Sequence, residues 1–271
     1  MNKGFNISGK VCVITGGTGV LGGAIAEYLL KNGAKVVILG TNQERLTKKL
    51  EHLQAIDNNV EGYVCNVLEK PAVEEACNQI VEKWGKADVL LNAAGGNMPG
   101  ATITEEQTIF DLDIDEFSKV SDLNLNGTLI PSLVFGKVMA DQGEGVIINY
   151  SSMAALRPIT RVVGYSASKA AVTNLTTWMA IEFAQKFGDK LRVNAIAPGF
   201  FIANQNRRLL MNDDESLTDR GKKVISNTPM NRFGEAEELN GAIHWLISDA
   251  ASFVTGAVIP VDGGFNAYSG V

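Results

Sequence analysis

Three side chains in the stretch NYSSMAALRPITRVVGYSASKAA (149–171) could move a proton together. Tyr165 and Lys169 are four residues apart in a helix-compatible segment, so they lie on one helical face, one turn apart. A lysine ammonium beside a phenol favours the phenolate and lowers the pKa of the tyrosine. Ser152, at the end of an apolar run, adds a hydroxyl that can orient a carbonyl. Together they could protonate a carbonyl, or take a proton from an alcohol, near neutral pH.

A glycine-rich turn, ITGGTGVLGG (14–23), precedes this set and joins an apolar run to a helix-like segment. Its spacing is G-x-x-G-x-x-G, from Gly16, Gly19 and Gly22, and not G-x-G-x-x-G. Backbone without a Cβ can approach a pyrophosphate, and the free N–H groups of the next helix favour an anion. The turn therefore predicts a dinucleotide site. We expect Gly19 to give the close approach to the pyrophosphate and Val20, which follows it, to pack inward as the helix begins.

The end of the second apolar run, ILGTN, bears on the choice of cofactor. A site selective for NAD usually has an acid here to bind the ribose 2′-OH, but this chain has Gly40, Thr41 and Asn42. Arg45, which could hold a 2′-phosphate, lies one turn further on. Thr41 and Asn42 are candidate cofactor contacts and equally candidate N-caps of the next helix. The sequence leaves NAD and NADP both open.

The elements that must position these residues alternate along the chain. Short apolar runs, typical of buried parallel strands, are separated by longer segments with helical spacing. The pattern predicts one doubly wound α/β domain (Rossmann fold) over residues 1–271, with a seven-stranded parallel sheet and helices on both faces. Ligands of such folds bind at the carboxyl ends of the strands. The predicted strands are 11–15, 35–40, 61–66, 88–92, 145–151, 192–197 and 257–261, and the helices are 21–31, 43–54, 71–84, 115–139, 166–187 and 235–248.

Composition restricts the class of protein. The 271 residues are 45% hydrophobic and carry a net charge of −6, which favours a soluble domain and argues against a nucleic-acid partner. No apolar run is long enough to span a membrane, and the N-terminus does not have a signal-peptide pattern. Three cysteines without CxxC spacing indicate reduced thiols in a cytoplasmic protein. His52 and His244 show no metal-ligand spacing, so no metal site is expected.

The chain resembles the short-chain dehydrogenase/reductases along nearly its whole length. The matching segments are TGGTGVLG (15–22), LNAAG (91–95), LNLNG (123–127), the Ser152–Tyr165–Lys169 set, APG (197–199) and VDGG (261–264). The resemblance implies a NAD(H) or NADP(H) cofactor, with Tyr165 as the acid/base and Ser152 positioning the substrate oxygen. It also implies that Lys169 lowers the pKa of the tyrosine and binds the nicotinamide ribose, and that Asn124 holds a water of a proton relay. We call these four residues the tetrad.

The same resemblance implies cofactor contacts along the strand ends, and a homotetramer joined through two long helices and the C-terminal segment. Ala93 and Asn66 depart from the usual Asn and Asp of the family. The expected cofactor contacts are Gly16, Thr18, Gly19, Val20, Leu21, Gly22, Thr41, Asn42, Asn66, Val67, Asn92, Ala93, Ala94, Gly95, Tyr165, Lys169, Pro198, Gly199 and Ile202.

Two variable segments should line the substrate mouth: residues 95–117 and a lid at about 200–230. Arginines near the mouth of an acidic protein favour a substrate carboxylate, because guanidinium groups bind carboxylates bidentately. The alternative is a set of solvated charges paired with Asp213, Asp214 and Glu215. The expected substrate contacts are Gly96, Asn97, Arg157, Asn204, Arg207 and Arg208. Other candidates are Arg161, Arg220, Lys222 and Lys223, with Gln205 and Asn206 adding amides for a polyol.

The segments GGNMPGAT and FFIANQNRRLL resemble the sugar-acid members of the family, notably D-mannonate oxidoreductases (fructuronate reductases) and gluconate 5-dehydrogenases. The expected activity is hydride transfer between a nicotinamide cofactor and a keto/hydroxy sugar acid, with D-fructuronate/D-mannonate as the first candidate. A 3-oxoacyl-carrier-protein reductase is the second enzyme hypothesis. A non-catalytic, nucleotide-sensing protein on the same fold is the third.

Overall fold

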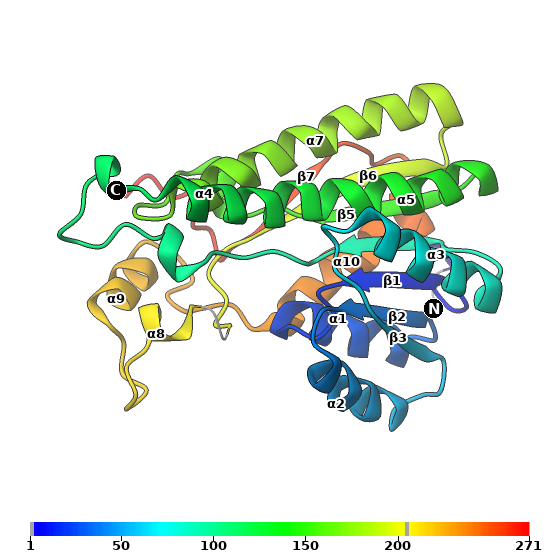
Figure 1. The fold of residues 1–271 in the computed structure, drawn as a ribbon, viewed down its shortest axis with the longest axis horizontal. Coiled ribbons are helices and arrows are strands. Elements are labelled where there is room, and N and C mark those ends of the chain that lie inside the picture. Colours follow the sequence, from blue (N-terminus) through cyan, green and yellow to red (C-terminus); the bar gives the residue numbers. More distant parts are fainter. Residues whose placement is uncertain (1–2, 204–205, 271) are drawn as a thin grey trace.

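A seven-stranded parallel sheet forms the centre of the protein (Figure 1). The computed structural model describes residues 3–203 and 206–270. The strand order is β3-β2-β1-β4-β5-β6-β7, as in a doubly wound fold, so the predicted fold class is confirmed. The strands are β1 (Val11–Thr15), β2 (Lys35–Gly40), β3 (Val60–Val64), β4 (Val89–Asn92), β5 (Gly145–Tyr150), β6 (Leu191–Pro198) and β7 (Val258–Val261).

The reversal of strand order lies between β1 and β4, where the chain changes from one side of the sheet to the other. Their last residues, Thr15 and Asn92, are paired in the parallel register. All residues of β1, β4, β5 and β6 are buried, because helices cover both faces of the sheet. The glycine-rich turn after β1 therefore begins at the crevice where doubly wound folds bind their ligands.

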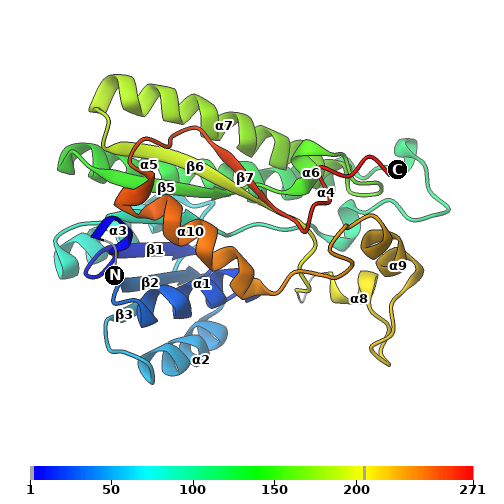
Figure 2. The ribbon, with the colours of Figure 1, turned by 180° about the vertical axis from the view of Figure 1, so that it is seen from behind.

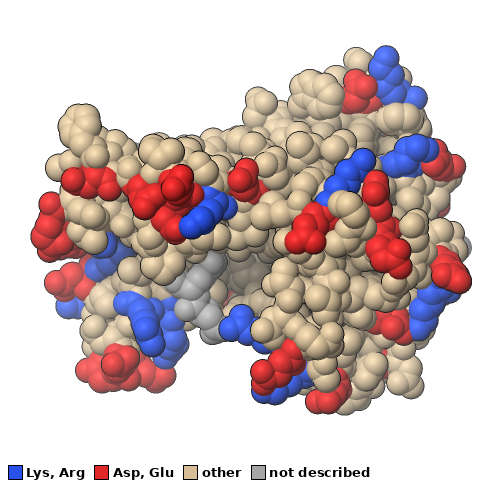
Figure 3. Space-filling model, in the orientation of Figure 1, with Lys and Arg blue, Asp and Glu red and all other residues tan. Residues whose placement is uncertain are grey.

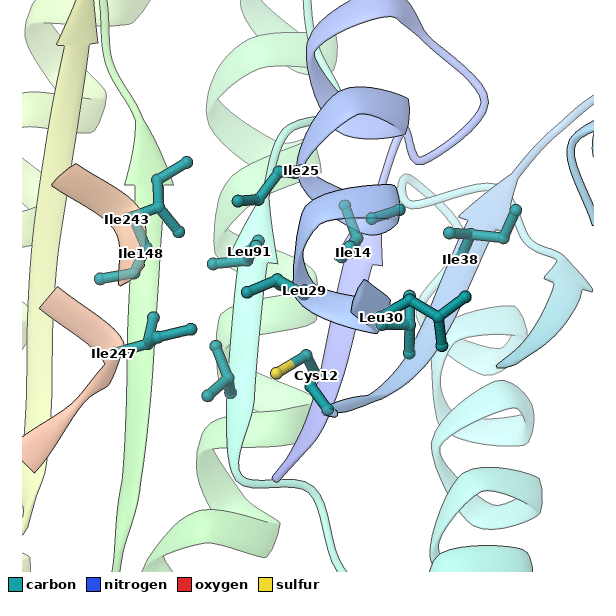
Figure 4. Packing of buried hydrophobic residues seen from close by; sticks show 14 of the residues in the cluster. Cys12, Ile14, Ile25, Leu29, Leu30, Ile38, Leu91, Ile148, Ile243 and Ile247 are labelled. Carbon is teal, nitrogen blue, oxygen red and sulfur yellow. The ribbon is translucent and has the colours of Figure 1, made fainter. Parts of the chain in front are cut away.

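Helices cover the two faces of the sheet in two separate apolar cores. One core packs α1, α2 and α10 against the sheet, and the other packs α3, α5 and α7 (Figure 2). Figure 4 shows part of the first core, with Ile25 and Leu29 of α1 and Ile247 of α10 over the strands. The helices are α1 (Val20–Lys31), α2 (Gln43–Gln54), α3 (Lys70–Trp84), α4 (Ile114–Ser121), α5 (Gly127–Gln142), α6 (Met153–Leu156), α7 (Val163–Phe187), α8 (Arg207–Leu210), α9 (Asp219–Ser226) and α10 (Asn240–Ile247).

The three cysteines are free and buried in these cores. Cys12 lies in β1 within the first core, while Cys65 and Cys77 belong to the second. Burial raises the pKa of the Cys12 thiol to about 12 and the pKa of each of the other two to about 11. All three thiols are therefore poor nucleophiles in the folded protein.

The helix expected at 115–139 is interrupted by a π-helical segment, Asp122–Asn126, between α4 and α5. The sequence did not predict this change, and the one buried residue of the segment is the polar Asn124. The element expected at 235–248 begins as a 3₁₀ turn, Ala236–Leu239, before α10. π-helical segments inside helices are often found at functional sites, and this one carries Asn124.

The predicted lid contains α8 and α9, which stand apart from the helices that cover the sheet (Figure 1). It follows β6, and an antiparallel bridge between Met211 and Leu217 closes the loop that joins the two helices. Within residues 3–203 and 206–270, no helix combines the length and apolarity that crossing a membrane requires.

Candidate active site

Tyr165 and Lys169 lie one turn apart on α7, as the sequence predicts. The Lys169 Nζ is 5.8 Å from the centre of the Tyr165 ring and donates a 2.7 Å hydrogen bond to the Tyr150 carbonyl at the end of β5. Ser152 is the N-cap of α6, and its Oγ accepts a 3.1 Å hydrogen bond from the Ala154 N–H. The Ser152 hydroxyl is also hydrogen-bonded to the Tyr165 side chain. Strand β5 thus holds the lysine and the serine beside one phenol.

Burial has the largest effect on the pKa values of Tyr165 and Lys169. It raises the pKa of Tyr165, and the hydrogen bond with Ser152 opposes that rise. Burial also lowers the pKa of Lys169 from its ordinary 10.5 to about 8. The net shift of the Tyr165 pKa is therefore upward, against the expectation of a lowered value, because burial outweighs the groups that favour the phenolate. A desolvated ammonium itself tends to lose its proton, and the hydrogen bond with Ser152 is what opposes the effect of burial on the phenol.

Asn124 is fully buried in the π-helical segment and binds the loop that follows β4. Its Oδ1 accepts from the Gly96 N–H at 3.0 Å, and its Nδ2 donates to the Gly96 carbonyl at 2.7 Å. Gly95 separates this amide from Lys169, since a Cβ at Gly95 would lie 2.7 Å from the Asn124 Oδ1 and 3.2 Å from the Lys169 Nζ. Gly95 thus leaves space beside the two polar groups. Gly96, an expected substrate contact, serves instead to position Asn124.

The glycine-rich turn is closely packed except at Gly19. Gly16 has φ +65°, and a Cβ there would lie 2.9 Å from the Ala94 backbone. A Cβ at Gly22 would lie 2.5 Å from the Gly16 carbonyl oxygen, whereas a Cβ at Gly19 would have only that oxygen nearby, at 3.2 Å. Gly19 is exposed, so its open side can face a ligand. Val20 is 38% exposed, so the expectation that it packs inward is wrong.

These observations fit a nicotinamide dinucleotide along the carboxyl ends of the strands. The turn from Gly16 to Gly22 would hold the pyrophosphate, because it presents backbone and the N-terminus of α1 without a Cβ at Gly19. Lys169 would hold the nicotinamide ribose, because its ammonium has donors beyond the one given to Tyr150. Leu21 is half-buried in the first turn of α1, and Thr18 lies against Gly40 at the end of β2.

The expected adenosine contacts differ in what their side chains do. Thr41 is exposed, while Asn42 caps α2 by accepting the Arg45 N–H at 2.9 Å. The Asn66 Oδ1 accepts from the Leu68 N–H at 3.1 Å, and its Nδ2 donates to Glu69. Val67 is buried against Gly127. The N-cap interpretation thus holds for Asn42, which keeps its side-chain NH₂ for other partners.

Asn92 does not have the position expected of a cofactor contact. Its side chain is 1% exposed, and its Nδ2 donates to the Ser132 Oγ at 2.8 Å and to the Asn149 Oδ1 at 2.9 Å. The amide therefore joins β4 to α5 and β5 inside the core. Ala93 and Ala94, which follow it, are half-buried, and the Ala94 N–H donates to the Thr15 Oγ1 at 3.1 Å.

The expected nicotinamide border follows β6. Pro198 is buried in the sheet, and Gly199 donates its N–H to the Val261 carbonyl at 2.9 Å. A Cβ at Gly199 would lie 2.7 Å from the Asp262 Cα, so a side chain here would push the two segments apart. Ile202, three residues further on, is half-buried.

A cavity of about 450 Å³ holds Ser152 and Tyr165 in its wall, together with Gly199. Figure 3 shows the surface hollowed between the lid and the rest of the molecule. The other lining residues come from the segment after β4, the stretch between the serine and the tyrosine, and the lid. They are Asn97, Met98, Pro99, Thr102, Thr104, Met153, Ile159, Arg161, Val162, Phe200, Asn206, Arg208, Leu209, Leu210 and Arg220.

Two of the expected substrate contacts, Asn97 and Arg208, line this cavity. Arg157 does not: it lines a neighbouring cavity, and its Nε donates to the Asn266 carbonyl at 2.7 Å. Arg207 is exposed and paired with Glu215 at 3.1 Å, which matches the alternative of solvated lid charges. Asn204 lies outside the described residues.

The cavity also contains Arg161 and Arg220, which were only secondary candidates in the sequence. Their charge and chain position were visible, but the turn that aims Arg161 inward was not. The apolar wall was not predicted at all, because Met153, Ile159 and Val162 carry no chemical signature. Among the described residues, no cluster of three His, Cys, Asp or Glu side chains could hold a metal ion.

Comparisons with known proteins agree with this geometry. Residues 18–266 match the family model described as Enoyl-(Acyl carrier protein) reductase. A Haemophilus influenza protein with the provisional name D-mannonate oxidoreductase, solved with bound NAD, is 44% identical at a TM-score of 0.90, with 98% of each chain covered. An uncharacterised Bacillus subtilis oxidoreductase, UxuB, is 44% identical over 98% of both chains. A Thermotoga maritima 3-oxoacyl-[acyl-carrier-protein] reductase is 32% identical over 96% of this chain and 99% of its own. The chain belongs to the short-chain dehydrogenase/reductase family and is an oxidoreductase.

Proposed function

We propose that this enzyme transfers a hydride between NAD(H) and a keto/hydroxy sugar acid, with the D-fructuronate/D-mannonate pair as the first candidate. One observation carries the proposal: three arginines, Arg161, Arg208 and Arg220, line the cavity that also holds Tyr165 and Ser152. On a protein of net charge −6, such a group of cations beside the reacting phenol fits an anionic substrate. The similarity to the Haemophilus protein supports both the sugar acid and the choice of NAD.

The proposed chemistry assigns one task to each residue of the site. When bound, the nicotinamide carries the hydride. In the direction of reduction, the Tyr165 hydroxyl donates its proton to the substrate carbonyl oxygen, which the Ser152 hydroxyl orients by a hydrogen bond. In the direction of oxidation, the phenolate of Tyr165 accepts the alcohol proton. Lys169 and Asn124, separated by Gly95, place an ammonium and an amide beside this transfer.

A polyol chain fits the side of the cavity formed by the segment after β4. The Asn97 Nδ2 donates to the Thr102 Oγ1 at 2.7 Å, but its Oδ1 is buried and has no hydrogen-bond partner among the residues that the structure describes. An unpaired buried acceptor is costly unless a ligand supplies a donor. A substrate hydroxyl would satisfy it.

The second candidate function, reduction of a 3-oxoacyl thioester, has one observation in its favour. Met153, Ile159 and Val162 give the cavity an apolar wall, and a relative with that activity is 32% identical. The arginines favour the sugar acid, because an acyl chain offers them no carboxylate. A gluconate 5-dehydrogenase would use the same site on a related sugar acid.

The test is a substrate panel with purified enzyme, run with NADH and with NADPH and followed by the loss of reduced-cofactor absorbance. We expect turnover of D-fructuronate, with 5-ketogluconate slower and acetoacetyl thioesters inactive. Turnover of the thioester alone would replace the proposed function by the second candidate. Cofactor binding without turnover of any carbonyl would indicate the nucleotide-sensing role.

We also propose a homotetramer in the cytoplasm. Trp178 and Ile181 of α7 and Leu133 of α5 are each more than half exposed, which is unusual for large apolar side chains unless a partner covers them. Three free thiols fit a reducing compartment. Light scattering after size exclusion tests the assembly, and a monomer at micromolar concentration would contradict it.

A further inference from the structure

We propose that Arg161 and Arg220 together form the binding site for the substrate carboxylate, with the lid supplying one arginine and the stretch between Ser152 and Tyr165 the other. This inference rests on the proposed function and adds the residues that distinguish an acid from a neutral sugar. The two arginines line the same cavity but lie on elements far apart in sequence. Arg161 precedes α7, and Arg220 is the second residue of α9.

The backbone of Arg161 is held in an unfavourable conformation. Its φ is +75°, in the left-handed region that favours glycine, and a branched or bulky residue is found there only when its surroundings impose it. The Arg161 carbonyl accepts from the Ile103 N–H at 2.9 Å, and the Arg161 Nε donates to the Ile103 carbonyl at 2.7 Å. One residue thus fixes both the backbone and the side chain of this arginine. Strain of this kind is concentrated at binding sites, where it aims a side chain.

These bonds leave the outer nitrogens of Arg161 available to a ligand. Its Nη1 is 3.7 Å from a carboxylate oxygen of Glu105, too far for a hydrogen bond, and the Glu105 side chain is 84% exposed. A guanidinium has five N–H donors, of which only the Nε–H is engaged in a hydrogen bond with residues 3–203 and 206–270. Within the described part of the chain, the end of the fork formed by Nη1 and Nη2, which can bind a carboxylate, makes no hydrogen bond.

Arg220 lies close enough to Arg161 for the two charges to interact. Its Nη2 donates to the carbonyl of Thr160, the residue before Arg161, at 3.2 Å. Among residues 3–203 and 206–270, no carboxylate forms an ion pair with it. Burial lowers its pKa first, and the nearby charge of Arg161 lowers the pKa further, while Glu105 raises it. The two guanidinium groups thus repel each other, and Glu105, the carboxylate near them, is largely exposed and 3.7 Å from Arg161.

A bound carboxylate would relieve this repulsion and connect the lid to the catalytic stretch. The apolar neighbours Ile159 and Leu210 reduce the local dielectric, which strengthens an ion pair formed there. The charge of the substrate then determines how firmly α9 is held over Tyr165. A neutral ketose could enter the cavity but would offer neither arginine a carboxylate.

The experiment compares one acid with one neutral substrate. kcat/KM is measured for D-fructuronate and for D-fructose, which has no carboxylate, with wild type and with Arg161→Gln and Arg220→Gln. Each variant should lose roughly 10- to 100-fold for the acid and change less than about threefold for the ketose, because a charge-assisted hydrogen bond is lost only with the former. The matched control is Arg207→Gln, which removes the same charge from an exposed ion pair outside the cavity and should leave both values unchanged.

Arg161→Gly guards against misfolding, because glycine adopts the left-handed conformation without strain. It should fold, bind NADH with unchanged affinity and show the same selective loss for the acid. Equal losses on both substrates, or no loss for the acid, would overturn the proposal while the sugar-acid activity of wild type stands.

If no carbonyl substrate is turned over, the proposed function fails and the carboxylate site is tested by binding alone. Thermal shift with D-gluconate should then stabilise wild type and Arg207→Gln, but not Arg161→Gln or Arg220→Gln. The same shift in all four proteins, or in none, would overturn the carboxylate site independently of any turnover.

Discussion

The nucleotide edge and the substrate edge of this protein are built by opposite means. The nucleotide edge is made of backbone, with Gly16 and Gly22 so close to neighbouring main chain that neither could carry a Cβ without displacement. The substrate edge is made of side chains on the lid, on the segment after β4 and on the stretch between Ser152 and Tyr165, with Arg161 strained and Arg208 without an ion pair among the described residues. Few substitutions are compatible with the backbone packing of the nucleotide edge. The side chains of the substrate edge, in contrast, can be replaced one at a time. The comparison indicates that one edge determines the reaction and the other determines which molecule undergoes it.

The largest expected effect removes the proton donor that both edges share. Tyr165→Phe keeps the ring but loses the hydroxyl, so turnover should fall by roughly 10³-fold or more. Binding of NADH, measured by isothermal titration, should change less than about threefold. A variant with full activity would refute the assignment of Tyr165 as acid/base.

The next effect tests whether Gly19 is needed for cofactor binding and Gly22 for the stability of the fold. Gly19→Val places a side chain on the open side of the turn, so the enzyme should fold normally and lose roughly 100-fold or more in cofactor affinity. Gly22→Ala places a methyl against the Gly16 carbonyl and should instead lower the free energy of unfolding by about 1–3 kcal/mol. Unchanged affinity in the Gly19 variant would mean that another glycine makes the close approach.

A third effect concerns the charge of Lys169 where the two edges meet. Its pKa is about 8 in the folded protein and 10.5 ordinarily, so between these values the unfolded chain binds one proton more. The contribution of Lys169 to stability should therefore rise by about 1.4 kcal/mol per pH unit from pH 8 to 10.5. The measurement is the difference in free energy of unfolding between wild type and Lys169→Met across that window. A difference that stays constant with pH would show that the lysine is not desolvated.

The smallest effect is expected at Val20, which follows Gly19 in the glycine-rich turn. Val20 is 38% exposed at the start of α1, so Val20→Gly removes little packing. Cofactor affinity should change less than about twofold, and stability should fall by no more than about 1 kcal/mol, the helix propensity of glycine. A loss of affinity as large as that of Gly19→Val would show that the valine side chain touches the cofactor.

The sequence predicted the sheet and the placing of Tyr165 and Lys169 on one helical face because both depend on local patterns. Apolar runs predict strands, and a four-residue spacing predicts a shared helical face. As a result β2, α2 and the pair of Tyr165 and Lys169 are where they were expected. The choice among arginines was not predictable, since Arg157 and Arg161 have the same charge and similar positions, and only backbone geometry separates them. The pKa of Tyr165 was mispredicted for a similar reason, because adjacency on a helix says nothing about desolvation.

The buried thiols can serve as probes of local unfolding. Cys12 belongs to the core under α1 and α10, and Cys77 to the core under α3 and α5, and neither is reactive while its core is closed. An alkylating reagent can modify each thiol only when its core opens. The rate of modification therefore measures the opening of one core separately from the opening of the other. If cofactor and substrate stabilise the two cores to different degrees, binding should slow the modification of Cys12 and of Cys77 to different degrees. Neither cysteine takes part in catalysis.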